Sequence, residues 1–408
     1  MIETLAIGDE LLTGKTADTN STFVSQVFFE NGLQVRRHTV IADSESDMEK
    51  SILEISSRAT LAICFGGLGP TSDDKTVDVV CRLLDCEPVM DLPSHEKLLV
   101  RYQERKRAVT TQALRQVRYP KKAKVIENDV GLAPIFYCTL KNCLFIFFPG
   151  VPSEMKSAFI KALPLIRENQ KALDAKIKNH TWRCLGIWES DLQRLMDPVE
   201  SKLSKDYWLG YRTVYPENHL TLYAKSANSQ WDTLVEEIEL ILKPYCYSTQ
   251  YDLESFLIQL LQSKNLSICF AESATGGLAT HRLSQVPGAS HVLFGGLVPY
   301  LKNAKANWLG IHRGTDDECI SKETTQELAY SVFEKNKVGV VASVTGAIEM
   351  IPGSNLYEGT FFLGVLLQGT YYVEEKLLLK YKTRPELQWG ATSYLYFLIK
   401  KVIENHPK

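Results

Sequence analysis

The sequence predicts an α/β protein built on doubly wound parallel sheets, with a smaller α+β module between two larger domains. Two observations predict this class. Short apolar runs alternate with amphipathic stretches of helical period, and glycine-rich polar loops connect them. The chain also has 408 residues, which is more than one domain normally holds. We therefore expect more than one domain.

Strands and helices alternate through the first part of the chain. Residues 20–31 form the first expected helix, with four apolar side chains on one face and Gly32 as its stop. Ser46 and Glu49 make a capping box that predicts the start of the second helix. This order implies a parallel sheet with helices on both faces. The expected strands are residues 2–7, 33–41, 61–64 and 143–148.

The pattern changes after residue 170. Residues 170–250 combine short strands at 182–187 and 219–224 with a helix at 229–242, which indicates a small α+β module. A second α/β pattern begins near Asp252. Its expected strands are residues 266–271, 337–344, 359–367 and 371–380, and a last helix follows Thr383. The expected domains are residues 1–170, 171–250 and 251–408.

Composition excludes several classes of protein. The net charge of −2 gives no basic field for nucleic acid. The first ten residues lack the basic and apolar regions of a signal peptide, and no apolar run approaches the roughly 18 residues of a membrane helix. The nine cysteines form no CxxC pair. We expect a cytoplasmic protein that contacts neither nucleic acid nor membrane.

Two polar loops follow expected strands of the first sheet. GDELLTGKTADTN occupies residues 8–20, and FGGLGPTSDDKT occupies residues 65–76. In open parallel sheets, ligands bind outside the carboxyl ends of the strands. Glycines let backbone N–H groups approach a phosphate closely, and the helix expected just after Asp73 would add partial positive charge. These loops therefore indicate a phosphate-binding site.

Four acids in these loops require an explanation: Asp9, Glu10, Asp73 and Asp74. Carboxylates repel a phosphate unless a hard cation such as Mg²⁺ bridges the two, which would suit metal-assisted attack on a phosphate ester or anhydride. A structural interpretation also stands. Asp73 can be a helix N-cap, Asp9 and Glu10 a solvated turn, and the glycines turn residues.

These loops and FPGVPSEM at 148–155 closely resemble the molybdopterin-binding-like domain of the CinA (competence/damage-inducible protein) family, over about residues 1–170. The resemblance implies metal-dependent ADP-ribose pyrophosphatase activity with Mg²⁺ or Co²⁺. It implies metal ligands at Asp9, Glu10, Asp73 and Asp74, the last two also catalytic. It implies substrate contacts at Gly8, Asn20, Gly66, Gly67, Gly69, Thr71, Thr76, Pro149, Gly150 and Glu154. One departure is NDVGLAPIF at 128–136, where Leu132 and Ile135 replace small residues and are expected to narrow or alter the pocket.

A third polar loop, ESATGG at residues 272–277, also lies between an expected strand and a helix. Its hydroxyls and amides can hold a phosphate or an oxyanion. Ser273 would need a base to act as a nucleophile; Lys305 can serve, with Tyr300 relaying a proton. The structural alternative is that Ser273 and Thr275 cap the helix while Tyr300 and Lys305 lie on the surface.

Residues 252–405 resemble the CinA C-terminal domain, whose family activity is hydrolysis of the carboxamide of nicotinamide mononucleotide, without a cofactor. The resemblance implies chemistry at Ser273, Tyr300 and Lys305. It implies substrate contacts at Thr275, Gly276, Gly277, Thr345 and Arg384.

This second resemblance departs from the family pattern at four places. Ala274 replaces the cysteine of ESCTGG, YLKNAK at 300–305 replaces YSNxxK, and Gln388 replaces an arginine. In TGAIEM at 345–350 the family's proline and glycine are lost. Glu349 there would oppose an anionic substrate by roughly 1 kcal/mol or more.

The middle segments WESDLQRLMD (188–197) and WLGYRTVYPENHLTLYAK (208–225) resemble the small KH-like CinA linker module, with Ser190 as a helix N-cap. The leading hypothesis is a homodimeric enzyme of pyridine-nucleotide salvage that cleaves ADP-ribose and deamidates nicotinamide mononucleotide. The alternative is a non-catalytic nucleotide- or pterin-binding protein with a structural C-terminal dimerisation domain.

Overall fold

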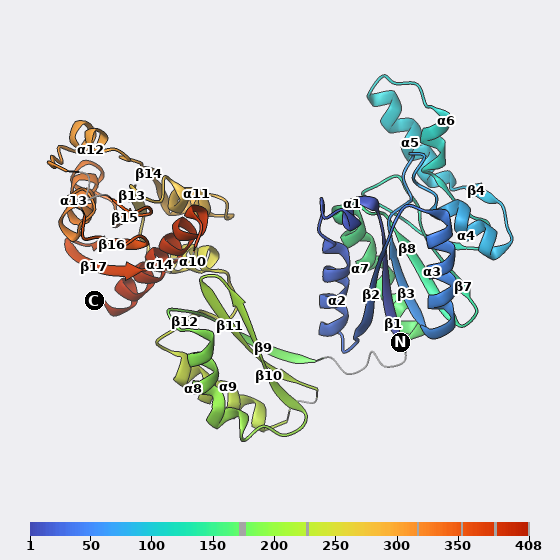
Figure 1. Cartoon of the computed structure of the whole chain (residues 1–408), viewed down its shortest axis with the longest axis horizontal. Helices are drawn as coiled ribbons and strands as arrows, with labels where there is room; N and C mark the ends of the chain where they lie inside the picture. Colours follow the sequence, from blue (N-terminus) through green and yellow to red (C-terminus); the bar gives the residue numbers. More distant parts are fainter. Residues whose placement is uncertain (171–176, 226–227, 316–317, 352–353, 379–381, 407–408) are drawn as a thin grey trace. The chain divides into compact units, whose positions relative to one another are not determined.

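The computed structural model describes residues 1–170, 177–225, 228–315, 318–351, 354–378 and 382–406 (Figure 1). Its contacts divide the chain into two compact units, Met1–Lys178 and Asn179–Lys408. Each unit has its own sheets and cores, and the predicted α/β class is confirmed. Among the described residues, no helix has the combination of length and apolar character that crossing a bilayer requires.

The first unit is built on a six-stranded sheet with the order β2-β1-β3-β8-β7-β6. The four strands at one side are parallel, and the other two join the sheet through antiparallel pairs, so β7 alone runs in the opposite direction. The four parallel strands are β1 (Ile2–Ile7), β2 (Val35–Ile41), β3 (Leu61–Phe65) and β8 (Cys143–Phe148), and the other two are β7 (Ile135–Leu140) and β6 (Lys124–Ile126). All the residues of β1, β3 and β8 are buried, as in a sheet covered on both faces.

Helices cover both faces of this sheet, which confirms the doubly wound arrangement (Figure 1). On one face, α2 (Thr19–Glu30) and α7 (Pro152–Asn169) pack against β-strand side chains such as Ile63 and Phe148. On the other face, α3 (Glu45–Arg58) and α4 (Thr76–Leu84) pack against Cys64 and Phe147. Neighbouring residues of one strand thus enter opposite cores, because strand side chains alternate.

A small excursion leaves this sheet between α4 and β6. It contains α5 (Leu92–Glu104), α6 (Thr111–Arg115) and a two-stranded sheet of β4 (Pro88–Met90) and β5 (Arg118–Pro120). Leu98, Ala113, Val117 and Leu132 form its core.

Three helix starts differ from those predicted. Helix α3 begins at Glu45, so Ser46 lies inside it and the predicted capping box with Glu49 is wrong. Helix α4, expected to begin just after Asp73, begins two residues later, at Thr76, because a turn precedes it. Helix α8 (Glu189–Glu200) begins before Ser190, and its N-cap is Trp188.

The second unit contains two sheets. The smaller one has the order β10-β11-β9-β12 and packs against α8 and α9 (Gln230–Leu242) around Trp182 and Trp231. Its strands are β9 (Lys178–Leu185), β10 (Tyr207–Val214), β11 (Glu217–Ala224) and β12 (Cys246–Ser248).

The larger sheet of this unit has the order β14-β13-β15-β16-β17. Helices α10 (Leu253–Ser263) and α14 (Arg384–Asn405) pack on one face, and α13 (Lys322–Asn336) packs on the other. Short helices α11 (Leu278–Ser284) and α12 (Lys302–Leu309) follow β13 and β14. The strands are β13 (Ile268–Glu272), β14 (Leu293–Leu297), β15 (Val340–Ala347), β16 (Thr360–Leu367) and β17 (Thr370–Leu377).

Candidate active sites at the two sheet edges

Three predicted loops of the first unit meet at one edge of its sheet. They follow β1, β3 and β8, which are adjacent parallel strands whose carboxyl ends lie together. The Gly66 N–H donates to the Phe148 carbonyl at 3.1 Å, and the Gly8 N–H donates to the Ile41 carbonyl at 3.0 Å. This is the crevice in which open α/β sheets bind their ligands.

Two glycines of the second loop are required by close backbone packing. Gly66 and Gly67 have φ angles of 101° and 68°, values that other residues rarely adopt. A Cβ atom on Gly66 would lie 2.3 Å from the Ile7 carbonyl oxygen, and one on Gly67 would lie 2.1 Å from Thr76 Oγ1. Thr76 is fully buried and donates to the Gly66 carbonyl at 3.0 Å, so its hydroxyl holds the loop in place.

Asn20 connects α2 to the loop after β8. Its Nδ2 donates to the Gly150 carbonyl at 2.8 Å, and its side chain is almost completely buried. Its Oδ1 is also buried and has no hydrogen-bond partner among the described residues. A buried acceptor without a donor is costly, so we expect a water molecule or a ligand to supply one.

Three of the candidate acids, Asp9, Glu10 and Asp73, lie near a further acid that is outside the loop motifs, Asp43. The Asp9 N–H donates to Asp43 Oδ2 at 3.0 Å, and the Asp43 N–H donates to Asp9 Oδ1 at 3.4 Å. Burial, followed by the nearby charges of Asp9, Glu10 and Asp73, raises the pKa of Asp43. Asp43 lies two residues after β2, and this position at the same sheet edge is the signal that could have identified it.

Asp74 holds the loop rather than facing the other acids. Its Oδ2 accepts hydrogen bonds from the Thr71 N–H at 2.8 Å and from Thr71 Oγ1 at 2.6 Å. Gly69 packs directly against it, because a Cβ atom there would lie 2.5 Å from Oδ2. Asp73 Oδ1 accepts a hydrogen bond from Ser72 Oγ at 3.1 Å.

The donor chemistry of this edge suits a hard cation. Within the described ranges, no three His, Cys, Asp or Glu side chains are gathered closely enough to hold a metal ion. The oxygen donors of Asp9, Asp43 and Asp73 are nevertheless the kind that Mg²⁺ prefers, and their mutual repulsion at Asp43 is what a cation would relieve. These carboxylates are therefore suitable ligands for such an ion. To bind it, they would have to lie closer to one another than they do in this structure.

The loop at residues 128–136 folds against Glu154 near the start of α7. Asn128 Nδ2 donates to Glu154 Oε2 at 3.3 Å, and Asn128 Oδ1 accepts from the Gly131 N–H at 2.9 Å. Leu132 and Ile135, the two residues expected to narrow or alter the pocket, are both buried. Leu132 packs in the core of the small excursion and Ile135 in the core beneath the main sheet.

In the second unit, the structure brings Ser273 and Lys305 together. Lys305 Nζ donates to Ser273 Oγ at 2.9 Å and to the Tyr300 carbonyl at 3.0 Å. Lys305 is 2% exposed and Ser273 is 8% exposed, so the surface position considered for Lys305 does not apply. A serine hydroxyl beside a buried amine is the arrangement of a nucleophile and its base.

Glu272 organises the loop that carries Ser273. Its fully buried carboxylate accepts from the hydroxyls of Thr275 and Thr280 at 2.7 Å and from three backbone N–H groups at 2.8 to 3.1 Å. Helix α11 starts at Leu278 with Gly277 as its N-cap, so neither Ser273 nor Thr275 caps it. Glu272 satisfies the N–H groups that the helix start leaves open.

The remaining predicted residues of this site form a polar chain at its entrance. The Arg384 guanidinium donates a hydrogen bond from Nη2 to the Tyr300 hydroxyl and another from Nη1 to the Glu349 carboxylate. Gln388 Nε2 donates to the Ala274 carbonyl at 2.9 Å. Gly276 and Gly277 form the positive-φ turn before α11, with φ angles of 63° and 96°.

Thr345 lies apart from this chain. Its hydroxyl is buried and shares a 2.8 Å hydrogen bond with Thr325. If the Thr345 hydroxyl contacted a substrate, that contact would compete with its hydrogen bond to Thr325.

Two family models match most of the chain. Residues 3–168 match the "Probable molybdopterin binding domain", and residues 250–402 match the "CinA C-terminal domain". A "Putative competence-damage inducible protein" of Clostridium botulinum (strain Okra / Type B1) is 32% identical over 396 residues, covering 91% of this chain and 93% of that protein. A "CinA-like protein" of Myxococcus xanthus is 32% identical over 359 residues, covering 85% of this chain and 84% of its own.

Among solved structures, the protein CinA from Thermoplasma acidophilum, described as of unknown function, is 30% identical to this chain. The match covers 40% of this chain and 96% of that one, with a TM-score of 0.37.

Proposed function

Because the chain belongs to the family of CinA-like, competence-damage inducible proteins, we propose that it is a hydrolase of pyridine-nucleotide salvage and that its first unit cleaves the diphosphate of ADP-ribose. The observation that carries this proposal is the convergence of three loops at one sheet edge around the unpartnered Asn20 Oδ1. An acceptor in that position suits a hydroxyl or amino group of a nucleoside.

The proposal assigns separate tasks to the loops. The positive-φ turn at Gly66 and Gly67 lets the backbone approach the diphosphate. Thr71 lies on the same loop, and Asp74 fixes its position through two hydrogen bonds, which makes Asp74 a positioning residue.

Asp9, Asp43 and Asp73 are the residues that we assign to a divalent cation, Mg²⁺ or Co²⁺, with Glu10 next to them. When bound, such an ion would offset the charge of the diphosphate and polarise its phosphorus–oxygen bonds. Without it, these carboxylates would repel the substrate, as they already repel one another at Asp43.

Release of AMP from ADP-ribose by the full chain tests this function, with Mg²⁺, with Co²⁺ and with a chelator. We expect turnover only with metal, and a loss of about 100-fold in the Asp9→Asn variant. The Asp47→Asn variant is the matched control, because Asp47 is an exposed aspartate on α3 outside the cluster. Saturable binding of ADP-ribose without AMP release would instead establish a non-catalytic nucleotide-binding protein.

A second activity, hydrolysis of the carboxamide of nicotinamide mononucleotide, is favoured by the contact between Ser273 and Lys305. In this reaction Ser273 Oγ attacks the amide carbon while Lys305, in its neutral form, takes the hydroxyl proton. The carbon–nitrogen bond then breaks and the proton leaves with ammonia. Water hydrolyses the resulting ester and restores the serine.

The charges at the entrance of this second site affect how it would bind the phosphate of nicotinamide mononucleotide. Arg384, the candidate partner for a phosphate, is paired with Glu349, so its charge is already balanced. Ammonia release from nicotinamide mononucleotide tests the activity, with Ser273→Ala as the inactive reference. No ammonia from the intact chain would leave this domain with a structural role, such as the dimerisation of the alternative hypothesis.

A further inference from the structure

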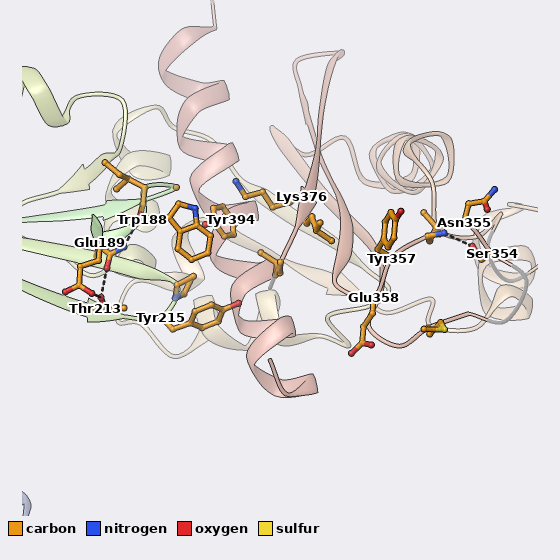
Figure 2. Close-up of a pocket in the computed structure, with 18 residues that line it drawn as sticks. Trp188, Glu189, Thr213, Tyr215, Ser354, Asn355, Tyr357, Glu358, Lys376 and Tyr394 are labelled. Atoms are coloured by element: carbon orange, nitrogen blue, oxygen red, sulfur yellow. Dashed lines mark hydrogen bonds between the residues drawn. The ribbon is translucent and has the colours of Figure 1, made fainter. Parts of the chain in front are cut away.

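A cavity of about 940 Å³ lies within the second unit, away from the candidate site at Ser273. Figure 2 shows its lining, which comes from the small module, from the loop after β15, from β17 and from α14. None of Ser273, Tyr300, Lys305 and Arg384 lines it. Its volume is in the range of pockets that bind small molecules and cofactors.

Aromatic side chains are concentrated in this lining. Trp188, Tyr215 and Tyr394 lie at one end of the cavity, and Tyr357 lies toward the other (Figure 2). Trp188 is 60% exposed and Tyr357 is 76% exposed, which is unusual for such large apolar rings. Exposed aromatic rings around a hollow are typical of a surface that binds a flat apolar ligand.

A lysine gives the same cavity a positive charge. Lys376 Nζ lies 4.2 Å from the centre of the Tyr394 ring, and burial lowers the pKa of Lys376. Lys376 makes no ion pair with any described residue. The acidic residues of the lining are Glu189, which accepts a hydrogen bond from Thr213 at 3.1 Å, and Glu358. The charge of Glu374 acts on Lys376, but Glu374 is ion-paired with Lys401 and not with Lys376, so this partly buried cation can attract an anionic group.

We propose that this cavity binds a small planar aromatic anion, with its ring between Trp188 and Tyr394 and its acidic group at Lys376. The proposal does not depend on either hydrolytic activity, because the cavity and the catalytic candidates share no residue. The volume of the cavity and the charge at Lys376 favour a small molecule over a second copy of the chain, which would cover the rim without filling the space.

Calorimetric titration of the full chain with 2-naphthoate, a flat aromatic carboxylate, tests the proposal. We expect saturable binding at one site per chain, weakened about tenfold or more in Trp188→Ala and in Lys376→Met. The neutral 2-naphthol should bind the wild-type protein more weakly, and the Lys376→Met variant should bind the two compounds equally.

Matched controls distinguish this cavity from other surfaces. Trp308→Ala removes a tryptophan of similar exposure, 52%, that does not line the cavity, and Lys322→Met removes a lysine of the surface. Both should bind 2-naphthoate as the wild type does, and so should Ser273→Ala. Equal binding by all variants, or no saturable binding, would overturn the proposal. The rim could instead be an interface between copies of the chain. In that case the wild type would bind no 2-naphthoate and Trp188→Ala would dissociate the oligomer in a sedimentation experiment, and this result would also overturn the proposal.

Discussion

Lys305 Nζ lies 2.9 Å from Ser273 Oγ, although 32 residues separate them in the chain and both side chains are nearly inaccessible to solvent. Two elements produce this contact. Glu272 fixes the turn after β13, and α12 delivers Lys305 from the loop after β14. Strands β13 and β14 are parallel neighbours, so their carboxyl ends lie side by side.

This contact predicts that Lys305→Ala abolishes ammonia release from nicotinamide mononucleotide. Removal of a catalytic base typically costs 10²–10⁴-fold in rate, and we expect a loss of about this size. Lys302→Ala, which removes an exposed lysine from the same helix, should keep the activity. Circular dichroism of each variant checks the fold, and full activity in a folded Lys305→Ala variant would exclude the assigned role.

A second prediction concerns the pairing of Glu349 with Arg384. The Glu349→Gln variant should leave Arg384 available to a phosphate, and so raise kcat/KM for nicotinamide mononucleotide. Since the opposing carboxylate is worth roughly 1 kcal/mol, the expected gain is about fivefold. Glu349 is exposed, so the gain should diminish as salt is added.

Nicotinamide riboside, which has the same carboxamide but no phosphate, is the control substrate. Its kcat/KM should not change in Glu349→Gln. An equal gain with both substrates would mean that Glu349 acts on the reacting end of the site, contrary to the assignment.

Most strands of the parallel core and the apolar faces of several helices could be predicted from the sequence, because apolar periodicity records which side chains enter a core. The stripe of Met48, Ile52 and Ile55 is an example, and all three are buried on α3. Positions of the loops at the carboxyl ends of β1, β3 and β13 followed from the same pattern. The excursion containing α5 and α6 was left unassigned.

The hydrogen-bond partners of side chains within the loops could not be predicted, because they depend on the conformation of the folded turn. Asp74 could not be assigned to Thr71 before the turn was known, because adjacent aspartates look alike in sequence. Asp43 was missed because it lies outside the motifs, and only the pairing of β1 with β2 places it next to Asp9.

A third prediction concerns the stability of the first unit. Gly66→Ala should destabilise it by several kcal/mol, because the new Cβ atom would meet the Ile7 carbonyl at 2.3 Å in a backbone of φ 101°. Gly14→Ala is the matched control: its φ is 72°, but nothing lies within 4 Å, so it should cost only about 1 kcal/mol. Denaturant unfolding measures both. Equal losses would mean that the loop relaxes around the added methyl group.

The last prediction tests the cation through stability instead of turnover. If Asp43 contributes to a Mg²⁺ site, the ion should raise the Tm of the first unit's transition in the wild-type chain and raise it less in Asp43→Asn. Binding to the folded state alone stabilises by about 2.7 kcal/mol when the free ion is at 100 times its Kd. Asp47→Asn should respond as the wild type does, and a chelator should reverse the effect. An identical response of all three proteins would remove Asp43 from the site, because its carboxylate is the only group that the substitution neutralises.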